Sequence, residues 1–158
     1  MIELNVLKHL MLVNCSECNV LPPLGKLPLL ESLEIKNMPN VEKVDFQFLG
    51  IGLNHEDAGN KGSSSDAIIA FPRLRKLHFM KLDKWEEWTG LNVNGGDKNI
   101  MPLLSSLSVV NCEKLESLPD YIKSKENLKP VIEGCSLLLE KEKEQKEMKS
   151  MDSINKAD

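Results

Sequence analysis

The stretch Leu-Ser-Ser-Leu-Ser-Val-Val-Asn-Cys, residues 104–112, decides the fold that we expect for this chain. Apolar residues occupy its first, fourth and sixth positions, and a cysteine stands at the ninth position. The same spacing recurs, with some substitutions, at residues 7–15, 30–38 and 74–82, and in part at residues 130–135. In this last copy Ile132 and Cys135 keep their spacing, but Pro130 takes a leucine position. Such self-similarity indicates an array of structural repeats.

The distances between the copies support this interpretation. Counted at the sixth position, successive copies are 23, 44, 30 and 23 residues apart. Two of these steps match the period of about 20–29 residues that is typical of leucine-rich repeats, and the other two require insertions. Two further apolar columns follow the copies: Cys18, Val41, Trp85 and Leu115, then Leu21, Val44, Trp88 and Leu118. We therefore expect an α/β leucine-rich-repeat solenoid of about four to five repeats.

Each copy predicts one short strand, because side chains alternate between the two faces of a strand. The leucines should point into the core, and strands of successive repeats should pair as a curved parallel sheet on the concave side. The chain should return along an irregular convex side. The Cys or Asn at the ninth position normally turns inward and satisfies backbone groups. Met38 and Leu82 offer no such group, so we expect their two turns to be less regular.

The chain divides into a repeat region, residues 1–139, and a charged tail, residues 140–158, which should be helical or disordered. Residues 50–70 form a Gly- and Ser-rich insertion, and a smaller one lies near residues 92–96. Neither end of the array has an obvious polar cap. Because solenoids need capping repeats for solubility, we expect marginal stability and self-association through the terminal repeats.

The outward residues of the four complete strands are the predicted partner-binding residues. Their mixture of charged, polar and apolar side chains suits a protein surface better than nucleic acid. They are His9, Met11, Val13, Ser32, Glu34, Lys36, Lys76, His78, Met80, Ser106, Ser108 and Val110.

Cys15 and Cys18 form a C-x-x-C motif, which permits half of a zinc site or a redox pair. We favour a structural interpretation, because Cys15, Cys112 and Cys135 share one repeat position and Cys18 lies in an apolar column. A zinc site would also need two further ligands nearby. All four cysteines are expected to be reduced thiols, and no metal or cofactor is expected.

The segment Trp85-Glu86-Glu87-Trp88 permits an exposed recognition patch, but both tryptophans fall in apolar columns, so core packing is favoured. His9 and His78 are expected at the surface, and His55 lies in the insertion. We find no phosphate-binding, dinucleotide-binding, zinc-protease or serine-hydrolase motif, so we do not expect an enzyme.

Composition sets further bounds on the function. The net charge is −4, with acids and bases interleaved, which argues against a nucleic-acid partner. The first residues lack the basic and apolar regions of a signal peptide, and no apolar stretch is long enough to span a membrane. We therefore expect a cytoplasmic protein that does not bind membranes.

Several motifs, in a fixed order over residues 4–139, resemble plant nucleotide-binding-site leucine-rich-repeat resistance proteins of the coiled-coil class. They are residues 21–28 (Leu-Pro-Pro-Leu-Gly-Lys-Leu-Pro) with 30–35, 48–51, 70–74, 85–88, 101–107, 115–119 and 134–135. The coiled coil and the nucleotide-binding domain have no counterpart here, so ATP or ADP binding is not carried over. Near Pro130 one strand residue is missing from the family's pattern, and the tail after Glu140 differs from the family's usual ending.

The resemblance implies a protein-recognition module in plant defence. Its partners would be pathogen effectors, guarded host proteins or the receptor's own upstream domains. The alternatives are a repeat scaffold or remnant without activity of its own, and a metal or redox protein using Cys15 and Cys18. The sequence does not identify the ligand.

Overall fold

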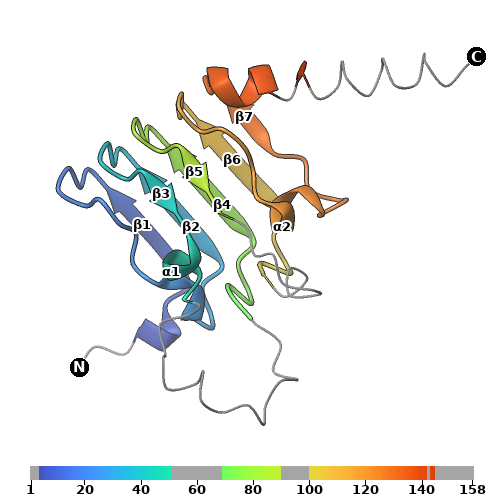
Figure 1. The fold of residues 1–158 in the computed structure, drawn as a ribbon. Helices are drawn as coiled ribbons and strands as arrows, with labels where there is room; N and C mark the ends of the chain where they lie inside the picture. Colours follow the sequence, from blue (N-terminus) through green and yellow to red (C-terminus); the bar gives the residue numbers. More distant parts are fainter. Residues whose placement is uncertain (1–3, 51–68, 90–99, 142, 145–158) are drawn as a thin grey trace, which may run out of the picture.

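The computed structural model describes residues 4–50, 69–89, 100–141 and 143–144 (Figure 1). Five short parallel strands form the main sheet, in the order β1-β2-β4-β6-β7: β1 (His9–Val13), β2 (Ser32–Lys36), β4 (Lys76–Met80), β6 (Ser106–Val110) and β7 (Val131–Glu133). Strands that follow one another in the repeats are therefore neighbours in the sheet. Each copy of the sequence pattern supplies one strand, as predicted.

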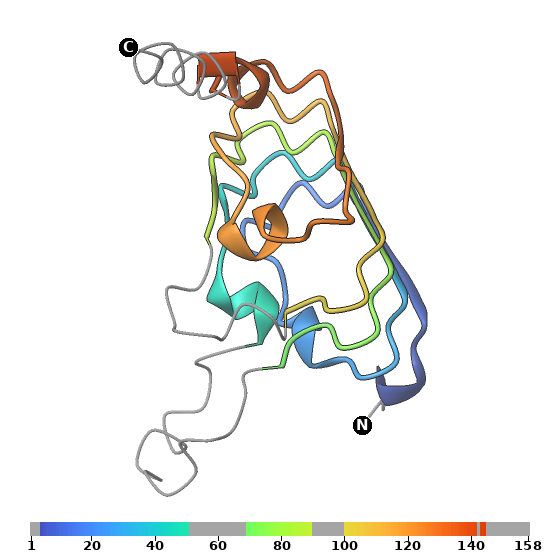
Figure 2. The ribbon, with the colours of Figure 1, turned by 90° about the vertical axis from the view of Figure 1, so that its right-hand side faces the viewer.

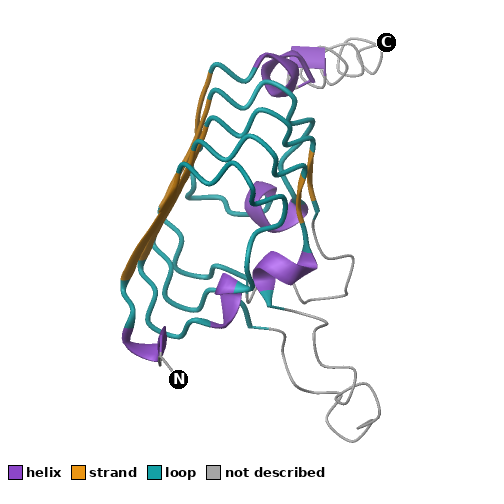
Figure 3. Cartoon of the chain, turned by 90° about the vertical axis from the view of Figure 1, so that its left-hand side faces the viewer, coloured by secondary structure: helices purple, strands orange, loops and turns teal. Residues whose placement is uncertain are grey.

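The return paths lie on the other side of this sheet (Figure 3). They hold the two-stranded parallel sheet β3 (Lys43–Val44) and β5 (Glu87–Trp88), and three short helices: η2 (Leu24–Lys26), α1 (Phe46–Leu49) and α2 (Asp120–Lys123). A further short helix, η1 (Leu4–Val6), precedes β1. Residues 136–141 are helical as well. Figure 2 shows these turns of chain stacked in sequence order. The fold is α/β with parallel sheets, which is compatible with a leucine-rich-repeat architecture.

The core lies between the main sheet and the return paths. Leu33, Leu77 and Leu107 are register partners across β2, β4 and β6, and each is at most 1% exposed. One column further along the strands, Ile35, Phe79 and Val109 pair and are buried in the same way. The predicted inward positions are therefore the buried ones. In the first strand, by contrast, Leu10 and Leu12 are only partly buried.

Aromatic side chains fill the core on the return side. Trp85 and Trp88 are both buried, which confirms their predicted core packing and excludes an exposed recognition patch. The Trp88 indole Nε1 donates a hydrogen bond to the Tyr121 hydroxyl at 2.6 Å, so this polar group is satisfied within the core. The ring of Phe79 lies 4.6 Å from that of Trp85, measured between centroids. This contact joins the strand side of the core to the return side.

The turns that follow the strands share one backbone conformation. The residue following each strand has a left-handed conformation, with φ between 54° and 64° in all five: Asn14, Asn37, Lys81, Asn111 and Gly134. The first four donate their backbone N–H to the last carbonyl of the next strand, at 2.8–3.1 Å. The turns before Met38 and Leu82 follow this rule like the others, so the expectation that they would be less regular was wrong. The backbone ladder fixes these turns without a polar side chain at the ninth position.

The predicted insertion of residues 50–70 lies mostly outside the described residues, and so does the one near residues 92–96. The repeats on either side of the first insertion are nevertheless joined, because the Phe71 N–H donates to the Gly25 carbonyl at 2.8 Å. Gly25 permits a close approach: a Cβ at this position would overlap the backbone of Leu49 at the end of α1.

The C-terminal end of the array is covered, contrary to the expectation that both ends lack a cap. In the turn after β7 Cys135 is fully buried, and Leu138 of the helix at 136–141 is buried over the last repeat. The exposed Glu140, Lys143 and Glu144 give this end a polar outer surface. Of the predicted tail, residues 140–141 and 143–144 are helical, and residues 145–158 lie outside the described part.

Candidate binding face

The twelve predicted partner-binding residues lie together on the face of the main sheet that points away from the core; we call this the outer face. Strand register arranges them in three columns. The first is His9, Ser32, Lys76 and Ser106; the second is Met11, Glu34, His78 and Ser108; the third is Val13, Lys36, Met80 and Val110. Adjacent strands lie about 4.8 Å apart, so each column is a continuous row of side chains. The sequence pattern predicted this arrangement correctly.

The three columns differ in chemistry. The first is polar throughout, the second mixes Met11 with charged and polar groups, and the third is mainly apolar. A partner that covers all three columns would have to offer hydrogen-bonding groups on one side and apolar groups on the other. Such a mixture is typical of the surfaces that proteins recognise in one another.

The fifth strand adds two outer-face residues that the sequence analysis missed. Val131 pairs with Ser108 and extends the second column, and Glu133 pairs with Val110 and extends the third. The partial copy at Pro130 carried the signal, because placing Ile132 inward directs both neighbours outward. We include Val131 and Glu133 in the outer face from here on.

A shallow hollow of about 180 Å³ lies on the outer face across β2, β4 and β6. Its polar lining residues are Ser32, Glu34, Lys76, His78, Ser106 and Ser108. Lysine and serine side chains donate hydrogen bonds, and Glu34 accepts them, so the hollow can hold a polar side chain of either kind. A partner's side chain could be seated in this hollow.

Two larger hollows lie on the return side, and neither includes an outer-face residue. One, of about 480 Å³, is lined mainly by polar residues around β3, among them Glu17, Glu42, Lys43 and Lys84. The other, of about 460 Å³, lies between β5 and α2 and is rich in acids, among them Glu86 and Glu116. Both are open surfaces between successive return paths and are lined mostly by polar residues; the half-exposed Val20 adds an apolar group to the first, and Trp88 and Leu118 line the second.

Interactions between charged groups in the second and third columns are weak. The Lys36 Nζ lies 3.7 Å from the Glu34 Oε2, and both side chains are about a third exposed. Such a pair contributes little to stability because water screens it. The pKa of His78 is lowered from its ordinary value, first by burial and then by the charge of Lys36, with Glu34 acting in the opposite direction. His78 is therefore neutral at pH 7 and can both donate and accept a hydrogen bond.

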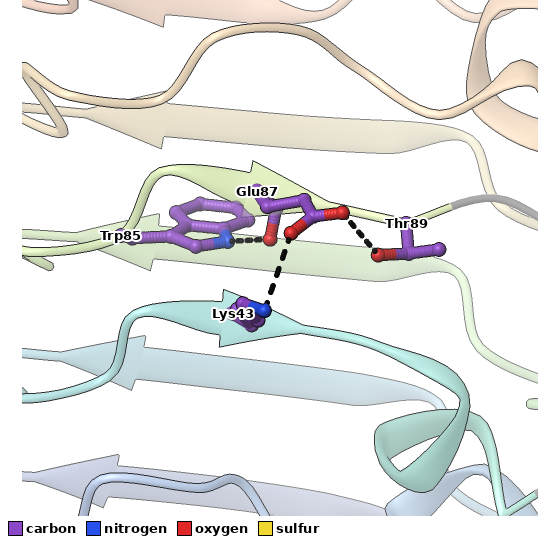
Figure 4. A network of polar contacts seen from close by, with 4 residues as sticks. All are labelled: Lys43, Trp85, Glu87 and Thr89. Carbon is purple, nitrogen blue, oxygen red and sulfur yellow. Dashed lines mark hydrogen bonds and ion pairs between the residues drawn. The ribbon is translucent and has the colours of Figure 1, made fainter.

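On the return side, a polar network fixes the segment that contains both tryptophans (Figure 4). The Lys43 Nζ lies 3.7 Å from the Glu87 Oε2, an ion pair that links β3 to β5. The Trp85 Nε1 donates to the Glu87 carbonyl at 2.9 Å, and the Thr89 hydroxyl lies 3.4 Å from the Glu87 Oε1. The ion pair joins two neighbouring return paths and the other two contacts lie within one path, so we assign the network a structural role.

The cysteines differ from the expectation in one respect. Cys15 and Cys18 form a disulfide, so the prediction of four reduced thiols was wrong for this pair. The turn after β1 brings their Cα atoms to 5.5 Å, within the range that a disulfide spans. Cys112 and Cys135 are free and buried. A hydrogen bond to Cys135, together with burial, raises the pKa of Cys112, so its thiol stays protonated.

The described residues contain no group of three or more His, Cys, Asp or Glu side chains that could hold a metal ion. Of the other histidines named from the sequence, His9 is exposed at the start of the first column, and His55 lies outside the described residues. Within the described part of the chain, no helix is long and apolar enough to cross a membrane.

These features define a class of protein: an α/β repeat protein with parallel sheets, compatible with the leucine-rich-repeat type, whose main sheet presents one open face. Comparison with known sequences then gives the family. The chain is 30% identical over 125 residues to a disease resistance RPP13-like protein 1 of Arabidopsis thaliana, and 31% identical over 128 residues to its disease resistance RPP8-like protein 3. A third relative from this plant, disease resistance protein RF45, is 36% identical over 89 residues.

The first two matches cover 78% and 80% of this chain, and the third covers 56%. The chain belongs to the family of plant disease resistance proteins of the nucleotide-binding-site leucine-rich-repeat type. It spans about a tenth of the length of these relatives, 11% of the first two and 8% of the third. No family model and no solved structure matches the chain.

Proposed function

We propose that this chain is a leucine-rich-repeat solenoid that serves as a protein-recognition module of a plant intracellular immune receptor. It binds a pathogen effector, a guarded host protein or another domain of the receptor through the outer face, which is the concave side of the array. It has no catalytic activity of its own. The observation that carries the proposal is the alignment of the outward residues of successive strands in three columns.

The inward and outward residues of each strand are constrained differently, and this difference supports the proposal. Inward residues such as Leu33 and Leu107 are fixed by packing, so exchanging them costs stability. Outward residues such as Lys76 are free of that constraint, and exposed substitutions usually change stability by only about 0.5 kcal/mol. A receptor family can therefore vary these columns and keep the fold.

The names of the relatives support the setting. They are disease resistance proteins of Arabidopsis thaliana. Within the outer face, the hollow around Lys76 and His78 can seat one polar side chain of the partner, while Met80 and Val110 contact its apolar part. The cytoplasm of a plant cell is the compartment that we propose for this interaction.

The test is a comparison of three immobilised baits in extracts of pathogen-challenged leaves. The first bait is the wild-type chain, and the second carries Glu34→Ala, Lys36→Ala, Lys76→Ala and His78→Ala on the outer face. The third is a matched control on the return side, with Glu42→Ala, Lys84→Ala, Glu86→Ala and Lys114→Ala, all exposed residues. Mass spectrometry identifies the captured proteins, and circular dichroism verifies that each bait is folded.

We expect one or more proteins to bind the wild-type and control baits and to be lost from the outer-face variant. Capture by all three baits alike would contradict the outer face as the binding site. If replacing residues 51–68 by a short linker abolished capture while the outer-face variant kept it, the insertion would be the recognition element. The absence of any specific capture would favour a scaffold without independent activity.

A further inference from the structure

The hollow on the outer face lies in the middle of the array, across β2, β4 and β6, and its charges do not cancel. The carboxylate of Glu34 is already offset, because the Lys36 Nζ lies 3.7 Å from its Oε2. His78 is neutral at pH 7. Lys76 is exposed and has no ion pair with any residue that the structure describes. The hollow therefore has one positive charge in excess.

The groups around the hollow leave this excess in place. At the start of the strands Arg75 lies beside Glu31, since the Arg75 N–H donates to the Glu31 carbonyl at 2.8 Å, and these two opposite charges add no net charge. On the other side, in the third column, the neighbours of Lys36 are the apolar Met80 and Val110. No acid in either row is left over to neutralise the ammonium group in the hollow.

The hollow also offers hydrogen-bond donors from three strands. Among the described residues, the hydroxyls of Ser32, Ser106 and Ser108 have no hydrogen-bond partner, and neither has the Lys76 ammonium group. An ammonium group has three donors and no acceptor, and a serine hydroxyl can rotate to donate to an anion. Adjacent strands lie about 4.8 Å apart, so these donors can reach one group placed between them.

The size of the hollow limits what it can hold. Its volume is about 180 Å³, whereas pockets for small-molecule ligands have about 300–1,000 Å³. One side chain of a bound protein is therefore a better match for the hollow than a nucleotide or another cofactor.

We propose that the partner places an acidic side chain, an aspartate or a glutamate, in this hollow, with its carboxylate between Lys76 and the serines of β2 and β6. This inference rests on the proposed function and names the chemistry of the partner at one point of the outer face. Hydrogen bonds from an ammonium group to a carboxylate are about twice as strong as those between neutral groups. The hollow should therefore hold an acid better than the corresponding amide.

A basic side chain fits the hollow less well. To reach Glu34 it would have to compete with Lys36, and it would lie in the same hollow as Lys76, which has the same charge. Like charges brought together in an interface weaken binding. The hollow thus distinguishes between partners by the sign of the charge that they present.

The first test selects binders from a random library of displayed peptides. The baits are the wild-type chain, Lys76→Glu, and the matched control Lys114→Glu, which reverses an exposed charge on the return path after β6. Circular dichroism verifies that each bait is folded. Peptides selected by the wild type and the control should share an aspartate or glutamate at one position, and those selected by Lys76→Glu should lack it. Loss of the acid with both variants would mean that net charge selects it, which would overturn the proposal.

The second test measures what this acid contributes. A synthetic peptide from the wild-type selection is compared by fluorescence anisotropy with a variant that has asparagine for the aspartate, or glutamine for the glutamate. On the wild-type chain the dissociation constant should rise by about tenfold or more. On Lys76→Glu the same change should not weaken binding, because the two single changes then remove one shared contact. A tenfold rise on both chains would contradict the contact with Lys76.

The remaining outcomes separate the acidic occupant from the proposed function. Selected peptides without a common acid that bind the wild type, but not the outer-face variant with four alanines, would leave the outer face as the binding site and overturn the acidic occupant. Peptides that bind this variant as well as the wild type would contradict both. Selection of no peptide would overturn the acidic occupant alone, since capture from leaf extracts tests the proposed function independently.

Discussion

Leu10 in β1 and Leu33 in β2 are register partners on neighbouring strands and occupy the same position of the repeat pattern. Leu33 is 0% exposed, whereas Leu10 is only partly buried. The pattern within a repeat thus sets the direction of each side chain, but burial comes from the repeats stacked on both sides. This difference between the first and second repeats yields a graded series of tests.

The largest effect is expected for Leu33→Ala. It removes a fully buried side chain between two neighbouring strands, so the free energy of unfolding should fall by about 2–5 kcal/mol. Leu107→Ala in β6 should behave in the same way. Urea unfolding followed by circular dichroism measures both, and a loss of less than about 1 kcal/mol would mean that the core is loosely packed.

Gly25→Ala should follow, because its new Cβ would overlap the Leu49 backbone where α1 ends. We expect a loss of about 1–3 kcal/mol, typical of overpacking in a dense interior. The change tests whether the return path between β1 and β2 really touches the end of α1 in the second repeat. A variant as stable as the wild type would show that they do not.

Leu10→Ala provides the direct contrast with Leu33→Ala. Because its side chain is already partly exposed, the loss should be about 1–2 kcal/mol when measured on the monomer. Equal losses for Leu10→Ala and Leu33→Ala in dilute solution would contradict the difference in burial.

The outer-face residues should give smaller effects. Alanine at Glu34, Lys36 or Lys76 should change the free energy of unfolding by no more than about 0.5 kcal/mol, as each keeps contact with water. Thermal unfolding of the three single variants tests this. Unfolding of the chain by any one of them would mean that its side chain supports the core.

The smallest effect concerns pH. The pKa of His78 is lower in the folded chain than in the unfolded one, so the unfolded state binds the proton more readily. The stability contributed by neutral His78 is therefore present above the ordinary histidine pKa and declines as the pH falls through it. Denaturation at pH 7.5 and 5.5 should show a larger loss for the wild type than for His78→Gln. If both proteins lost the same free energy of unfolding between these pH values, the burial of His78 would not be the cause of the pH dependence.

The main sheet and its register could be predicted from the sequence because they depend on one repeated spacing. Features that depend on contacts between repeats could not. The left-handed turns before Met38 and Leu82 are held by backbone bonds to the next strand, and the pairing of β3 with β5 joins return paths 44 residues apart. The disulfide at Cys15 depends on how tightly the chain turns after β1, which spacing alone left open.

For the candidate face, the twelve predicted residues lie where the spacing placed them. The partial copy hid Val131 and Glu133, because Pro130 interrupted the pattern by which their strand would have been counted. The spacing of the repeats alone does not indicate the chemistry of a partner. It depends on which outward residues stand side by side, and only the register shows that.

The hydrogen bond from Phe71 to Gly25 has a consequence for how such genes can change. It aligns the repeats before and after residues 51–68 directly, so strand register does not depend on the length of the chain between them. In-frame insertions and deletions in this part of the coding sequence should therefore be tolerated. Alleles that differ there in length should share one sheet, and their proteins should have the same unfolding temperature.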